Sequence, residues 1–180
     1  MWPRDNVEKA ALVAALIVLG AVILDSSAAS RWKEFTSTEG AFRVLMPEKP
    51  KTENQSIAVN GSKMELHSFS AWNRNNAEFT VTYADAQVPP TAAAGEKILD
   101  AQGQSLIQGD ERRMLSAEKL IVSGYSVRQY KAIAEDGSEA DEKLFLVKRR
   151  LYTLLVVHDR GRDGDDVKQF FNSFSFQPRE

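Results

Sequence analysis

The sequence predicts an α+β domain with a central, mainly antiparallel sheet. Two blocks of the chain alternate polar and apolar residues, and each block is followed by a segment with helical periodicity. In the second block, residues 151–158 (LYTLLVVH) are nearly all apolar, which is typical of a central strand covered on both faces. No Pro-, Gly- or Ser-rich stretch divides residues 31–180. We therefore expect them to form one domain.

The first block of strands begins at residue 41. Ala41–Met46 alternates, and Pro47 ends the run. Asn60-Gly61 is the strongest hairpin signal in the chain, because both residues tolerate positive φ. We expect the two strands of this hairpin and the strand that follows them over Thr52–Val59, Ser62–Trp72 and Glu78–Ala84.

The first helix is expected over Ala92–Gln108, with Thr91 as its N-cap. Gly95 and Gly103 weaken this prediction, and Gly109 suits the C-terminal cap. The remaining elements are three strands, a turn at Asp136-Gly137, the central strand and a last helix. We expect these strands and the last helix over Lys119–Val122, Ser126–Ala134, Lys143–Val147, Leu151–His158 and Asp165–Ser173. The buried side of the last helix is expected to consist of Val167, Phe170, Phe171 and Phe174.

The first thirty residues resemble an export signal. Ala10–Leu24 has no polar side chain and is fifteen residues long, the upper limit of a signal-peptide core and short of a membrane span. Ser27 and Ala29 are small residues placed for cleavage before Ser30. We expect residues 1–30 to be a signal peptide or a hydrophobic helix that anchors the chain. Either outcome puts residues 31–180 outside the cytoplasm.

Composition excludes several classes of function. Cysteine is absent, which excludes disulfides, thiolate metal sites and a cysteine nucleophile. The formal net charge is −2, so nothing in the overall charge favours nucleic acid. The serine-hydrolase motif is missing, since Gly124-Tyr125-Ser126-Val127-Arg128 lacks the second glycine, and no phosphate-binding glycine loop occurs. We expect neither an enzyme nor a cofactor.

Four phrases resemble one family in their order and spacing. They are residues 34–37 (EFTS), 39–50 (EGAFRVLMPEKP), 150–154 (RLYTL) and 170–174 (FFNSF). They resemble the opening and closing segments of PsbP-like (Mog1/PsbP) domains, and the resemblance covers most of residues 32–176. It implies an α/β/α sandwich in a largely non-enzymatic family of binding or assembly factors. No motif for contact with a photosystem or with Ran is present, so the resemblance carries over no partner.

One loop suggests metal-binding chemistry that its residue pattern does not complete. His158, Asp159 and Asp163 are candidate metal ligands, in a run that partly fits an EF-hand loop. Gly161 stands at the third position of that loop and Phe170 at the twelfth, so two ligands are missing. We therefore expect a polar turn that caps the last helix, and no metal.

Three residues are candidate contacts to a partner. Trp32 follows the export segment, where it either packs at the edge of the domain or anchors a partner. Arg149 and Arg150 lie in an expected hairpin turn, as solvated charges or as a docking point for an acidic partner or lipid headgroups. The sequence favours a non-catalytic exported binding or assembly module that acts at or near a membrane, with an unidentified envelope or membrane protein as partner. The alternative is an envelope protein that binds a small ligand or a metal.

Overall fold

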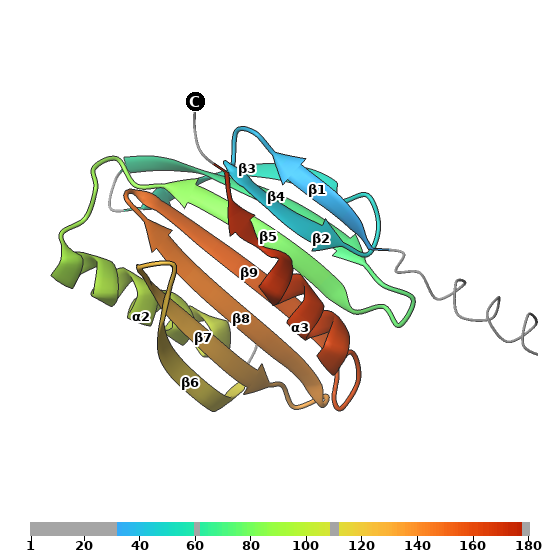
Figure 1. The fold of residues 1–180 in the computed structure, drawn as a ribbon. Helices are drawn as coiled ribbons and strands as arrows, with labels where there is room; N and C mark the ends of the chain where they lie inside the picture. The colour runs from blue at the N-terminus through green and yellow to red at the C-terminus, as the bar shows by residue number, and fades with distance from the viewer. Residues whose placement is uncertain (1–31, 60–61, 109–111, 178–180) are drawn as a thin grey trace, which may run out of the picture. The chain divides into compact units, whose positions relative to one another are not determined.

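The computed structural model describes residues 32–59, 62–108 and 112–177, which contain a seven-stranded antiparallel sheet (Figure 1). The strand order is β3-β4-β5-β9-β8-β7-β6, so the apolar β9 lies in the middle, as predicted. The α+β class and the mainly antiparallel sheet are confirmed. The seven strands are β3 (Lys51–Val59), β4 (Ser62–Trp72), β5 (Glu78–Asp85), β6 (Arg113–Val122), β7 (Tyr125–Ile133), β8 (Ser138–Val147) and β9 (Arg150–Asp159).

One face of this sheet carries a small second sheet and the helix α3 (Gly164–Ser173) (Figure 1). The small sheet has the order β1-β2-β10, from β1 (Lys33–Ser37), β2 (Phe42–Met46) and β10 (Ser175–Phe176). Val167, Phe170 and Phe171 form the buried side of α3, as the helical spacing predicted. They pack in one apolar core with residues such as Phe42 and Phe79, both of which are fully buried.

The opposite face is covered over β7 and β8 by α2 (Ala92–Gln108), which begins as predicted. The backbone N–H of Ala94 donates to the Thr91 hydroxyl at 3.3 Å, which caps the helix. Leu99 and Leu106 of α2 pack in a second core with Tyr130 and Leu144 of the sheet. Helices on both faces of one sheet make the predicted α/β/α sandwich.

A buried arginine joins α2 to the sheet. Arg128 on β7 is 2 % exposed, and its Nε donates to Asp100 Oδ1 at 2.7 Å. Its Nη2 donates to the Glu96 carboxylate, one turn earlier on the helix. Burial alone would lower the pKa of Arg128, but these hydrogen bonds outweigh it and raise the pKa, so the guanidinium stays charged.

The differences from the prediction lie at the sheet edges and at the ends of strands. No strand was expected at β1 or β10, which among the described residues pair only with β2. Edge strand β6 begins at Arg113, not at Lys119, since most of its side chains are exposed and hide its periodicity. β8 begins at Ser138, not at Lys143.

Some predictions concern residues outside the described ones. They are the N-terminal hydrophobic helix over residues 10–24, the boundary at residue 30, the Asn60-Gly61 turn and the Gly109 cap. The strands on both sides of that turn pair as expected, with Val59 opposite Ser62. Over residues 32–59, 62–108 and 112–177, no helix has the length and apolar character needed to cross a membrane.

Candidate functional site

A pocket of about 540 Å³ opens at the end of the sheet where two hairpin turns meet the C-terminal segment. Tyr125 contributes from the start of β7, directly after the β6–β7 turn, and the turn between β8 and β9 contributes Lys148 and Arg149. Phe176 of β10 supplies an apolar wall, and its ring lies 5.4 Å from that of Tyr125, nearly edge to face. The pocket therefore combines aromatic walls with a cationic rim.

The two turns hold these side chains in place through unusual backbone angles. Ser123 and Gly124 both have positive φ, 53° and 82°, which is the geometry of a two-residue turn that matches the strand twist. Lys148 also has a positive φ, 57°, in a position where glycine is usual. A lysine there costs about 1 kcal/mol or more of backbone strain, which marks the turn as a functional candidate.

Arg150 is a structural part of the pocket wall. Its Nε and Nη2 donate to the two carboxylate oxygens of Asp85 at 2.7 and 2.6 Å, and its Nη1 donates to the Glu39 carbonyl at 2.7 Å. Its guanidinium lies 4.3 Å from the ring centre of Tyr83. Burial lowers the pKa of Arg150, but the bonds to Asp85 raise it further, so Arg150 stays charged.

Lys148 and Arg149 are the accessible cations of the pocket. Both are exposed. Arg149 Nη2 lies 3.8 Å from Asp85 Oδ2, a long ion pair to a carboxylate that Arg150 already engages with two hydrogen bonds. The pocket has more positive than negative charge among these groups, so it suits an anionic group attached to an apolar body.

Trp32, the other candidate partner contact, does not line this pocket. It is half-buried, and its ring meets that of Phe79 edge to face at 4.9 Å. This contact places Trp32 against the core, which is the edge packing that the sequence left open as one of two roles. Of the three candidate residues, the structure brings Arg149 and Arg150 together and leaves Trp32 apart.

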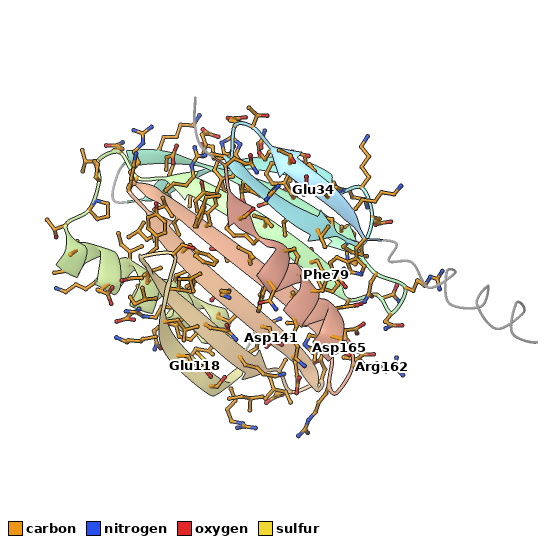
Figure 2. The ribbon with its side chains drawn as sticks, viewed as in Figure 1. Glu34, Phe79, Glu118, Asp141, Arg162 and Asp165 are labelled. Carbon is orange, nitrogen blue, oxygen red and sulfur yellow. The ribbon has the colours of Figure 1, made fainter. Side chains whose placement is uncertain are left out.

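A second group of polar side chains lies at the other end of the sheet. Glu139 and His158 are directly opposite on β8 and β9, and Asp141 follows on the same face of β8, near the end of the sheet at which α3 begins (Figure 2). His158 Nε2 lies 2.9 Å from Asp141 Oδ2, and Lys131 Nζ lies 2.8 Å from Glu139 Oε2. Asp141 raises the pKa of the His158 imidazole, against the effect of burial.

The other two candidate metal ligands are not part of this group. The Asp159 carboxylate pairs with Arg162 at 3.6 Å. Asp163 Oδ1 accepts hydrogen bonds of 2.7 Å from the side-chain amides of Asn73 and Asn75. Asp163 is the N-cap residue of α3, but its side chain makes no capping hydrogen bond. The expected polar turn is therefore present, and it does not cap the helix through the Asp163 side chain.

Sequence reasoning missed Glu139, Asp141 and Lys131. Glu139 and Asp141 alternate along β8, which would have placed both on one face of a strand. That signal was lost because the strand was expected to begin only at Lys143. Lys131 lies opposite Asp141 on β7, and only the register of the sheet reveals this pairing.

Comparison with known proteins shows the fold. No family model matches the chain, and no curated protein matches it. The solution structure of cyanobacterial PsbP (CyanoP) from Synechocystis sp. PCC 6803 is similar, with a TM-score of 0.50 and 15% identity over 84% of this chain and 95% of that one. The fold is therefore PsbP-like.

A second similar structure is a crystal structure from Bacteroides thetaiotaomicron VPI-5482. Its TM-score is 0.49 and its identity 10%, over 81% of this chain and 48% of that one. This chain thus spans about half the length of the Bacteroides protein.

Proposed function

We propose that this protein is a non-catalytic, exported binding module of the PsbP-like family that acts at or near a membrane. Its pocket between the β6–β7 and β8–β9 turns would hold an acidic segment of an envelope protein. The observation that carries this proposal is the exposed pair Lys148 and Arg149 beside the aromatic wall of Tyr125 and Phe176. An acidic residue of the partner would contact the cationic rim, and an apolar residue beside it would contact the aromatic wall.

Arg150 supports this use of the pocket because it keeps the rim cationic. Asp85 lines the pocket, and Arg150 binds its carboxylate with two hydrogen bonds. Asp85 is therefore less available to neutralise Arg149. The same bonds tie the β8–β9 turn to β5, together with a 2.8 Å bond from the Ala86 N–H to the Arg149 carbonyl. A turn held in this way binds a partner at a low entropic cost.

The export segment supports the place of action. Residues 10–24 would either be removed with a signal peptide or keep the protein on the membrane, and both routes bring residues 31–180 to the envelope. The absence of the common hydrolase and phosphate-binding motifs supports a binding role over catalysis.

The test is a charge reversal at the pocket. The full-length protein is crosslinked mildly in native membranes, purified, and its companion is identified by mass spectrometry. Arg149→Glu should reduce recovery of the companion roughly tenfold, because it places a carboxylate where an acidic segment docks. Arg74→Glu is the matched control, since Arg74 is exposed in the turn between β4 and β5, at the opposite end of the sheet, and makes the same charge change.

A charge swap between this protein and its companion protein makes the test specific. Replacing an acidic residue of the companion by lysine should restore binding to Arg149→Glu, and not to the unmodified protein. Equal losses in Arg149→Glu and Arg74→Glu, or a loss in neither, would exclude the pocket as the docking site.

A second candidate function is binding of a metal ion or small ligand in the envelope. The cluster of Glu139, Asp141 and His158 favours it, because three metal-ligating groups meet there.

A further inference from the structure

We infer that Glu139, Asp141 and His158 bind a divalent transition-metal ion such as Zn²⁺, which takes the place that the Lys131 ammonium otherwise fills. The cluster lies at the opposite end of the sheet from the turn pocket. This inference therefore does not depend on the proposed docking of a partner.

The three ligand atoms already converge. One histidine nitrogen and two carboxylate oxygens lie within 4.8 Å of one another. With metal–ligand bonds of about 2.0–2.2 Å, neighbouring ligands of a tetrahedral ion are roughly 3.4 Å apart, so carboxylate rotations suffice to close the site. The register of β8 and β9 fixes the backbone, since Glu139 is opposite His158 and Asp141 is two residues further on.

The histidine is held as metal-binding histidines usually are. His158 Nδ1 lies 2.9 Å from the Asp159 carbonyl oxygen, which can only accept, so Nδ1 carries a hydrogen and donates it. That bond fixes the ring and points Nε2 at Asp141 Oδ2, also at 2.9 Å. Metal-ligating histidines characteristically donate their second N–H to such a carbonyl. A metal ion would replace the proton between Nε2 and Asp141.

A cation already occupies the centre of the carboxylate pair. Lys131 Nζ lies 2.8 Å from Glu139 and 3.6 Å from Asp141. The side chains of Glu139 and Asp141 are only 9% and 13% exposed, so they need a positive partner. The Lys131 side chain is 36% exposed and flexible, which lets it turn into solvent and open a route for a metal ion.

A further cation approaches from the exposed side. Arg160 Nε lies 3.8 Å from Glu139 Oε1, and its side chain is 74% exposed. This long contact leaves Arg160 free to withdraw when a divalent ion binds. Both competing cations are thus on flexible side chains, whereas the three ligands are on paired strands.

The ligand set selects the kind of metal. One imidazole and two carboxylates suit Zn²⁺ and neighbouring transition metals, and leave a fourth position for water. Ca²⁺ takes six to eight oxygen ligands and gains nothing from an imidazole. The chain has no cysteine, so no thiolate competes for the metal.

The test is a titration of the full-length, tag-free protein in mild detergent after treatment with a chelator. Isothermal titration with ZnCl₂ should show one saturable site per chain in the micromolar range, and CaCl₂ should give no such heat. CoCl₂ should produce visible absorption bands of a cobalt ion with few ligands, including nitrogen. Circular dichroism checks that each variant remains folded.

Histidine variants locate the site. His158→Ala should weaken Zn²⁺ binding by roughly tenfold or more, because it removes the nitrogen ligand. The other histidine gives the matched control: His67→Ala should leave binding unchanged, since His67 bonds Asn54 on another part of the sheet. If His158→Ala does not fold, Asp141→Asn serves in its place.

A lysine variant tests the competition. Lys131→Met keeps the length of the side chain and removes its charge, so Zn²⁺ should bind roughly tenfold tighter. Lys119→Met is the control, because Lys119 is exposed and pairs with Asp100 away from the cluster. The inference is overturned if the unmodified protein shows no saturable Zn²⁺ site, or if binding survives both His158→Ala and Asp141→Asn. Binding that appears only in Lys131→Met also overturns it, because Lys131 would then be a permanent partner.

Discussion

Two buried ionisable residues of the sheet differ in whether hydrogen bonds compensate their burial. Arg150 is 7% exposed and donates to Asp85 and to a backbone carbonyl. Glu142 is 3% exposed, and its Oε2 has no hydrogen-bond partner among the described residues. It lies on the face of β8 that α2 covers, opposite Tyr130 and Leu155. Burial raises the pKa of Glu142 from 4.5 to about 8.

The Glu142 carboxyl should make the stability of the domain depend on pH. Between about pH 4.5 and pH 8 the folded protein holds a proton that the unfolded chain releases, so the free energy of unfolding falls as the pH rises. Glu142→Gln removes this effect and should stabilise the protein by roughly 1–3 kcal/mol at pH 8, with little change at pH 4. Urea unfolding at both pH values measures it.

Glu118→Gln is the control for that experiment, because Glu118 makes the same chemical change on the exposed edge strand β6. It should shift stability by less than about 0.5 kcal/mol at either pH. A Glu142→Gln variant with the same pH dependence as the unmodified protein would show that the fold does not raise the pKa of this carboxyl.

At the scale of elements, α2 approaches the sheet closely at two glycines that face it. A Cβ added at Gly95 would come within 2.8 Å of Leu146, and one at Gly103 within 2.1 Å of the Tyr130 ring. The two glycines that weaken the helix prediction are therefore the points at which α2 contacts β7 and β8. Local helix propensity disfavours glycine at these positions, whereas close packing against the sheet requires it. The effect of packing is the larger one here.

Gly103→Ala should destabilise the protein by roughly 1–3 kcal/mol, although alanine is the better helix former. The added methyl group would collide with the Tyr130 ring and push α2 away from the sheet. Gln104→Ala, at an exposed position of the same helix, is the control and should be nearly neutral. Thermal unfolding of both variants checks the prediction, and a more stable Gly103→Ala would show that α2 can move outward freely.

At the scale of the whole domain, the two polar sites occupy opposite ends of one strand. Arg150 begins β9 beside the turn pocket, and His158 lies near its end in the acidic cluster. Eight residues at ~3.3 Å each separate them by roughly 26 Å. A partner in the pocket and a metal ion in the cluster could therefore bind at the same time.

The proposed export concerns the entire chain, and it predicts where the protein is found. Protease added outside the cytoplasmic membrane of native cells should degrade it without lysis, while a cytoplasmic marker protein survives. Mass spectrometry of its N-terminus should then give either Ser30 or the full chain, which distinguishes cleavage from anchoring. Finding the intact chain in the soluble cytosolic fraction would exclude export.

The sequence alone predicted the α+β class, the central position of β9 and the apolar side of α3. Periodicity reports which face of an element is buried, and these elements bury continuous faces in the core. It also singled out Arg149 as a charge in a tight turn, but it placed Arg150 in the same turn, whereas Arg150 is buried at the start of β9 and bonds Asp85.

Only the tertiary structure decided the strand order, the role of the α2 glycines and the composition of both sites. The acidic cluster combines side chains from three strands, namely Lys131, Asp141 and His158. Their contacts depend on the register between those strands. Likewise, Arg150 is held in the wall of the turn pocket because Asp85 lies opposite it on β5. Contacts between residues far apart in the chain arise from packing of the whole sheet, which leaves no periodic signal in the sequence.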